Sequence, residues 1–207
     1  MTRTSKRATS VPLLLSAILA AVLLLGGTIA LMKTTDSVTN RIKIPQYRFD
    51  VSIVEVFDPP TDPIKPGDEP IEKRVSVTNN GDLPGFARLL ILPTIIAADG
   101  YTVLPAHIGT EILANLNASE WADGGDGYYY YLGVLAPTET SPELFSTISL
   151  AANLDERYKG ATFNIEVKCE AIGIKKWDYR VGWWGGPDAP DSADLIPIDK
   201  ILRELAI

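Results

Sequence analysis

TFNIEVKCEAI, residues 162–172, is the most regular stretch of this 207-residue chain and decides its fold. The apolar side chains of Phe163, Ile165, Val167 and Cys169 alternate with polar ones, and a period of two is typical of a strand that buries one face. Glycine and proline, with 16 and 15 residues, divide the rest of the chain into short segments. The stretch therefore predicts a β-strand that faces a hydrophobic core.

Other segments of the chain alternate apolar and polar residues in the same way, or consist almost entirely of apolar residues. Asn80-Gly81 and Asp99-Gly100 predict tight turns, because both residues of such pairs tolerate positive φ. Pro93 is expected to end the strand that contains Arg88. The expected strands are residues 47–53, 71–78, 86–92, 128–132, 144–150 and 162–172, with a hairpin over 95–104. Short strands without strand–helix alternation predict an all-β fold, an antiparallel β-sandwich or jelly roll.

The first 30 residues have the features of a signal peptide. Three basic residues precede an apolar run at residues 11–25, and Thr28 and Ala30 occupy the small-residue positions of a cleavage site. We therefore expect export from the cytoplasm and cleavage after Ala30. Residues 11–31 also approach the ~20 residues that a membrane-spanning helix needs, so an uncut N-terminal membrane anchor is the alternative.

The rest of the chain divides into three expected parts. Residues 31–44 are polar, without a strong apolar period, and predict a mobile N-terminal arm. Residues 45–176 form the expected β-sandwich domain, and residues 177–207 form a C-terminal extension that breaks the strand pattern. In that extension, Asp199 is expected to cap a final turn or two of helix.

Charge and cysteine content restrict the possible partners. Removal of the signal peptide leaves 16 basic and 26 acidic residues, a formal net charge of −10. This balance argues against nucleic acid as a partner, and it leaves residues 11–31 as the only expected membrane contact. Cys169 is the single cysteine, so no internal disulfide can form, and a buried structural thiol is expected.

Catalytic chemistry has little support in the sequence. His107 is the one histidine, whereas a zinc protease or a Ser-His-Asp enzyme needs further ligands or a nucleophile motif that we do not find. Asp123 and Asp126 lie in a glycine-rich loop where oxygen atoms could bind calcium, although their spacing is not that of an EF-hand and a solvated turn is the alternative. Trp183 and Trp184 are candidates for an aromatic sugar-binding surface. We expect no catalytic residue and no required cofactor.

The order of several short motifs resembles the TasA/camelysin-like family of exported proteins. The motifs are GGTIA (26–30), NRIKIPQYRFDVSIVEV (40–56), IKPGD (64–68), KRVSVTNNG (73–81), FAR (86–88), DGYYY (126–130), LAPTET (135–140) and EVKCEAI (166–172). The resemblance implies a jelly-roll domain, export through a signal peptidase of the SipW kind and location outside a Gram-positive cell. It also implies fibres in a biofilm matrix, formed by strand complementation between subunits. Residues 183–207 depart from the family pattern.

Together these features predict a secreted structural protein of the extracellular matrix or cell surface. Self-association through edge strands is expected, with the arm at residues 31–44 donated to the next subunit. A cell-surface module that binds carbohydrate or another protein is the first alternative, and a hydrolase is a weaker one.

Overall fold

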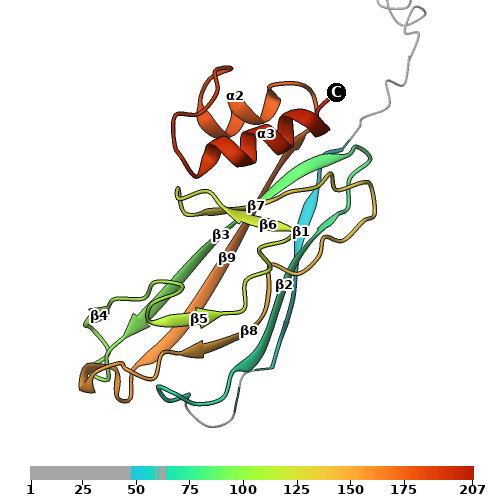
Figure 1. The fold of residues 1–207 in the computed structure, drawn as a ribbon. Helices are drawn as coiled ribbons and strands as arrows, with labels where there is room; N and C mark the ends of the chain where they lie inside the picture. The colour runs from blue at the N-terminus through green and yellow to red at the C-terminus, as the bar shows by residue number, and fades with distance from the viewer. Residues whose placement is uncertain (1–47, 59, 61–63) are drawn as a thin grey trace, which may run out of the picture. The chain divides into compact units, whose positions relative to one another are not determined.

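Two antiparallel β-sheets contain most of the regular secondary structure in the part of the chain that the structure describes (Figure 1). The structure is a computed structural model, and it describes residues 48–58, 60 and 64–207. The expected signal peptide at residues 1–30, with Thr28 and Ala30, and the expected arm at residues 31–44 lie outside these residues. In the described part, no helix has the length and apolar content needed to cross a membrane.

Sheet A has four strands in the order β1-β2-β8-β5, and sheet B has five. In sheet B, β9 pairs with one side of β3, while β7 and β4 pair with the other side and β6 follows β7. The strands are β1 (Val51–Phe57), β2 (Ile71–Asn79), β3 (Gly85–Ile96), β4 (Val103–Leu104), β5 (Ile112–Ala114), β6 (Trp121–Asp123), β7 (Tyr128–Tyr131), β8 (Phe145–Leu150) and β9 (Thr162–Gly173). Every pairing between these strands is antiparallel, which confirms the predicted all-β class.

The pairing of β3 with β9 is the longest among the strands that the structure describes, and it confirms the strand predicted at residues 162–172. Its register runs without a shift from Gly85 opposite Gly173 to Ile96 opposite Thr162. Gly85 exchanges both of its backbone hydrogen bonds with Leu135, at 2.8 and 3.1 Å, on the side away from β9. Because backbone groups alternate along a strand, the odd-numbered residues of β3 also point away from β9. The odd-numbered residues of β9 then point away from β3.

Pro93 does not end β3, contrary to the sequence-based expectation, because the strand continues to Ile96. Pro93 is odd-numbered, so its nitrogen faces the side of β3 opposite β9. On that side, β7 pairs with residues 88–90 and β4 with Ile95 and Ile96, and Pro93 lies in the gap between them. A proline is tolerated in a strand where no neighbour needs its missing N–H. Pro93 is therefore tolerated within β3 because of its position in the sheet.

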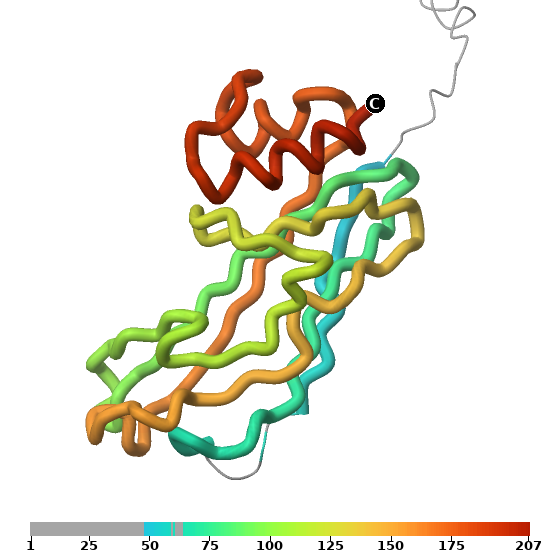
Figure 2. The backbone as a smooth tube through the Cα atoms, in the orientation of Figure 1, coloured from blue at the N-terminus to red at the C-terminus, as the bar shows by residue number. Residues whose placement is uncertain are grey.

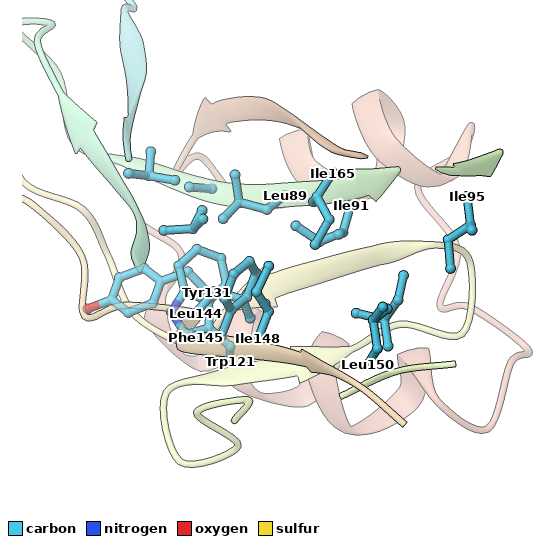
Figure 3. Packing of buried hydrophobic residues seen from close by; sticks show 14 of the residues in the cluster. Leu89, Ile91, Ile95, Trp121, Tyr131, Leu144, Phe145, Ile148, Leu150 and Ile165 are labelled. Atoms are coloured by element: carbon cyan, nitrogen blue, oxygen red, sulfur yellow. The ribbon is translucent and has the colours of Figure 1, made fainter. Parts of the chain in front are cut away.

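Side chains from both sheets form one hydrophobic core (Figure 3). Leu89 and Ile165 of sheet B lie opposite Ile148 and Leu150 of sheet A. The buried members are Val75, Val77, Ala87, Leu89, Ile91, Ile95, Leu104, Ile112, Trp121, Tyr131, Leu135, Leu144, Phe145, Ile148, Leu150, Tyr158 and Ile165. The alternation in β9 thus places its apolar side chains toward sheet A, as the sequence predicts.

The C-terminal extension contains two α-helices that pack against sheet B near the end of β9 (Figure 2). They are α2 (Asp178–Trp184) and α3 (Leu195–Leu205), and a short 3-10 helix, η1 (Glu156–Tyr158), precedes β9. Their apolar side chains and the outward-facing side chains of β3 and β7 form a second buried cluster. Its members are Phe86, Tyr130, Tyr179, Leu195, Ile198 and Leu202. The helices therefore cover an apolar part of the outer face of sheet B.

Asp199 does not cap α3, contrary to expectation. The helix begins at Leu195, after Asp194 at the N-cap position, and Asp199 lies within it. Asp199 is buried and accepts hydrogen bonds from Arg180 of α2. The partner that permits a buried carboxylate at this position comes from another helix.

Candidate functional site

The candidate residues Trp183 and Trp184 lie in the last turn of α2, where both are half-buried. The Trp184 indole N–H donates a 3.0 Å hydrogen bond to the Tyr130 hydroxyl, and the Trp183 ring meets the Tyr130 ring edge to face at 5.6 Å. Trp184 also packs edge to face on Tyr179, at 5.3 Å between ring centroids. Both indoles thus make contacts within their own chain that join α2 to sheet B.

Arg88 forms the centre of the contact between sheet B and α2. Its side chain is buried, and its guanidinium carbon lies 3.7 Å from the Tyr128 ring centroid and 5.0 Å from that of Trp183. It donates hydrogen bonds to Glu170 at 2.6 and 2.9 Å and to the Tyr130 hydroxyl at 3.0 Å. Burial opposes ionisation of Glu170, but the hydrogen bonds from Arg88 and Tyr128 outweigh it and lower the pKa of Glu170. A face of the Trp183 ring is therefore already in contact with a cation of its own chain.

The four consecutive tyrosines of β7 alternate between the two clusters, as a strand requires. Tyr129 and Tyr131 pack with the core between the sheets, whereas Tyr128 and Tyr130 face the helices. Burial, with a hydrogen bond to Asp126, raises the pKa of Tyr130 to about 12. This tyrosine therefore stays protonated at neutral pH and donates a hydrogen bond to Asp126.

Of the candidate calcium ligands, Asp123 is the last residue of β6 and Asp126 lies in the loop that joins β6 to β7. Asp123 accepts a 2.9 Å hydrogen bond from the N–H of Gly125. Asp126 accepts hydrogen bonds from the N–H of Tyr128 at 3.1 Å and the hydroxyl of Tyr130 at 2.7 Å. Within the described residues, no group of three or more His, Cys, Asp and Glu side chains is arranged to hold a metal ion. Both carboxylates have roles in the geometry of this turn.

His107 lies in an exposed loop before β5. Its ring nitrogen Nδ1 is 2.9 Å from a carboxylate oxygen of Glu111. The backbone N–H and the ring of His107 bind this carboxylate and lower the pKa of Glu111. The pair holds the loop that leads into β5.

A second candidate site, which the sequence analysis did not locate, is the outer edge of β9. One side of β9 pairs with β3 along its whole length. Among the described residues, no backbone hydrogen bond reaches its other side. By the alternation described above, the free N–H and C=O groups belong to the odd-numbered residues, which are Phe163, Ile165, Val167, Cys169 and Ala171. β9 thus offers a long edge on which another strand can form a ladder.

The side chains of the same odd-numbered residues are incompletely covered. Phe163, Val167 and Cys169 point toward the core but are only half-buried, whereas Leu89 and Ile95 of the adjacent β3 are almost fully buried. Burial raises the pKa of the Cys169 thiol to about 12, which disfavours its reactive thiolate form at neutral pH. The core is therefore open on the β9 side.

β1, the edge strand of sheet A, lies next to β9 across this opening, and no backbone hydrogen bond joins them. We refer to the space between β1 and β9 as the seam. A cavity of about 630 Å³ lies at one end of the seam, bordered by Phe57 of β1 and by residues 162–165 of β9. Lys73, only 4% exposed, forms an ion pair with Glu55 at its wall, and its Nζ lies 4.4 Å from the Phe57 ring centroid. The seam thus combines free backbone groups of β9 with a cavity lined by both apolar and polar side chains.

Comparisons of the chain with models of protein families, with curated proteins and with solved structures found no match. The resemblance to the TasA/camelysin-like family therefore stays a prediction from the sequence.

Proposed function

We propose that this chain is a secreted structural protein of the extracellular matrix or surface of a Gram-positive bacterium, and that its subunits associate by β-strand addition. The signal-peptide features of residues 1–30 support export. The acidic composition is compatible with a soluble protein outside the cell. No cofactor is part of this proposal.

We also propose that the two sheets form a β-sandwich, since one core takes side chains from both. The order β1-β2-β8-β5 matches the order A-B-E-D of an immunoglobulin-like sandwich. β3 and β9 then take the places of strands C and F, which are neighbours in the second sheet. This order favours an immunoglobulin-like sandwich over the jelly roll that was the other expectation.

The observation that carries the proposal of self-association is the free edge of β9. Soluble proteins commonly protect edges by keeping them short, by covering them or by placing proline and charge on them. β4, β5 and β6 have only two or three residues each, which limits what can pair with them. β9 has twelve residues, and within the described part of the chain nothing pairs with its outer side.

The test uses the protein recovered from the medium of an expressing culture. N-terminal sequencing establishes whether cleavage follows Ala30, and multi-angle light scattering with negative-stain electron microscopy measures assembly. We expect concentration-dependent oligomers or fibres from the wild-type protein. Deletion of residues 31–41 should give a folded monomer with an unchanged circular dichroism spectrum.

Two outcomes contradict the proposal. A wild-type protein that stays monomeric at the highest accessible concentration excludes structural self-association. Fibres of normal length from the deletion variant exclude donation of the arm. The binding-module alternative is tested in the same preparation by glycan binding of the Trp183→Ala and Trp184→Ala variants.

A further inference from the structure

We infer that the cavity at the end of the seam binds a small uncharged amphiphile, a molecule with an apolar body and one hydrogen-bond acceptor, and that Lys73 binds the acceptor. Occupancy of this site does not require self-association, so it goes beyond the proposed structural role. Four features of the described residues carry it: the position of Lys73, the partners of its ammonium group, the lining of the cavity and the charge at its wall.

Lys73 occupies a position at which the strand pattern calls for an apolar core residue. The odd-numbered residues of β2 face the core between the sheets, where Ile71, Val75 and Val77 contribute apolar side chains. Lys73 belongs to this inward series and is almost fully buried. A lysine is rarely buried unless it is paired, and an apolar side chain of similar size is often as stable or more stable in such a place. A charge that interrupts a core-facing strand therefore indicates a functional site.

The ammonium group of Lys73 has more donors than the described residues use. An ammonium group carries three N–H donors. One of them binds Glu55, which lies on the neighbouring strand β1. Phe57 is directly opposite Lys73 in the register, and its ring attracts the charge at 4.4 Å without being a conventional hydrogen-bond acceptor. Within the described part of the chain no second acceptor binds this group, so a donor is available to a molecule in the cavity.

The lining and the volume of the cavity suit the apolar body of a small ligand. Strands β1, β2, β8 and β9 all border the cavity, which places it between the two sheets. Its volume of about 630 Å³ lies within the range of about 300–1,000 Å³ that is typical of small-molecule sites. At ~30 Å³ for each water-sized atom, it admits up to roughly 20 non-hydrogen atoms. The apolar side chains of the wall include Ile71, Ile148, Leu150, Phe163 and Ile165.

Two aromatic side chains border the cavity from the two sides of the seam. Phe57 of β1 is 40% exposed and Phe163 of β9 is half-buried, whereas Ile148 of β8 is almost fully buried. A ligand that covers the remaining apolar surface of these rings gains the hydrophobic part of its binding free energy. The same exposure leaves a route between the solvent and the cavity.

The charge at the wall favours an acceptor without a charge of its own. Lys73 and Glu55 form an ion pair, so their charges balance. A carboxylate that approached the ammonium group would also approach Glu55, and like charges in a partly buried site repel each other. Glu55 is the one acidic side chain among the described residues of the lining, and it is already paired, so a cation has no free partner there. An alcohol, ketone or ester oxygen accepts a hydrogen bond from Lys73 without these costs.

The first experiment uses n-octanol as the probe and the protein recovered from the culture medium. Titration by saturation-transfer difference NMR measures the dissociation constant. Lys73→Met keeps the length of the side chain but removes the donors. We expect this variant to bind at least ~10-fold more weakly, since a hydrogen bond to a charged group exceeds the ~1.4 kcal/mol of a tenfold change. Lys168→Met, on the exposed face of β9, is the matched control and should bind as the wild type does.

The second experiment changes the volume of the cavity and keeps Lys73. Ala161 lines the cavity just before β9, and the ring of Ala161→Phe has room to fill part of it. We expect this variant to lose n-octanol binding while its melting temperature stays the same or rises. A loss of binding without a loss of stability separates occupancy of the site from a general effect on folding.

The third experiment tests the charge of the ligand with octanoate. The wild type should bind octanoate more weakly than n-octanol. Glu55→Gln leaves the charge of Lys73 without its counter-ion, so this variant should bind octanoate more tightly than the wild type does.

Four outcomes contradict the inference. Absence of saturable n-octanol binding to the wild type excludes the site. Equal binding by a folded Lys73→Met excludes recognition by Lys73, and equal binding by Ala161→Phe shows that the probe lies elsewhere. Octanoate that binds the wild type more tightly than n-octanol excludes an uncharged ligand.

Discussion

Replacement of Asp199 by alanine should strongly destabilise the packing of the C-terminal helices. The carboxylate of Asp199 accepts two hydrogen bonds of 2.6 Å from the Arg180 guanidinium and one of 2.8 Å from the Tyr179 hydroxyl. The side chains of Arg180 and Asp199 are each 7% exposed. Alanine at this position leaves a buried guanidinium without its counter-ion, and leaves the Tyr179 hydroxyl only the more distant backbone carbonyl of residue 199, at 3.4 Å.

The magnitude follows from this loss of partners. Removal of one member of a buried ion pair costs about 3–5 kcal/mol, because the remaining charge is desolvated and uncompensated. The weakened hydrogen bond of the Tyr179 hydroxyl belongs to the same network, so its cost overlaps with this value and is not added. In a domain of this size, 1 kcal/mol shifts the melting temperature by about 2–4 °C. We therefore expect a decrease of about 6–20 °C in Tm.

Urea denaturation and thermal melts measure the effect, and hydrogen exchange of α3 locates it. Asp191→Ala is the matched control, because Asp191 is exposed, and its change should stay within about 0.5 kcal/mol. The double variant Arg180→Met with Asp199→Leu should recover most of the lost stability, since an apolar pair replaces a buried ionic one at little cost. A loss below 1 kcal/mol for Asp199→Ala refutes the argument.

Two further predictions concern ionisation. The hydrogen bonds from Arg180 outweigh burial and hold the pKa of Asp199 below its ordinary value, and Glu170 is lowered in the same way by Arg88. Stability from these carboxylates is therefore present above about pH 4 and is lost as the pH falls through their folded-state pKa values, which acid titration of unfolding should show. Cys169, with its pKa raised to about 12 by burial, should react more slowly with a thiol reagent at pH 8 in the native protein than in urea; equal labelling rates in the two states contradict this shift of its pKa.

The parts of the fold that the sequence predicted are those governed by local periodicity. The alternation of core-facing and outward-facing side chains in β9 and in the tyrosines of β7 depends only on the two-residue repeat of a strand, so it could be predicted from the sequence. The hairpin with Ile95 opposite Leu104 followed from the Asp-Gly pair, where Gly100 has φ +77°. β5 and β6 were missed because three residues carry no measurable period.

The parts that could not be predicted depend on contacts between distant residues. Pro93 was misjudged because tolerance of a proline depends on which neighbour faces its nitrogen. Asp199 was misjudged because its partner Arg180 lies on another helix. Arg88 could be identified from the sequence as a residue of interest. A single arginine in an otherwise apolar strand indicates a buried charge that needs a partner. Glu170, which binds it, is 82 residues away in the chain.

The placement of the C-terminal helices bears on the proposal of strand addition. The chain after β9 covers an apolar patch around Phe86 and Tyr130 on the outer face of sheet B, and a buried ion pair fixes the two helices together. Covering this patch removes an exposed apolar surface that would promote unspecific association. The same residues leave uncovered the edge of β9, where association is directional and can be selective for a strand of suitable pattern. A subunit that suppresses unspecific contacts on a face while keeping a long edge open is suited to ordered assembly, which is why we favour a structural role over that of a monomeric binding module.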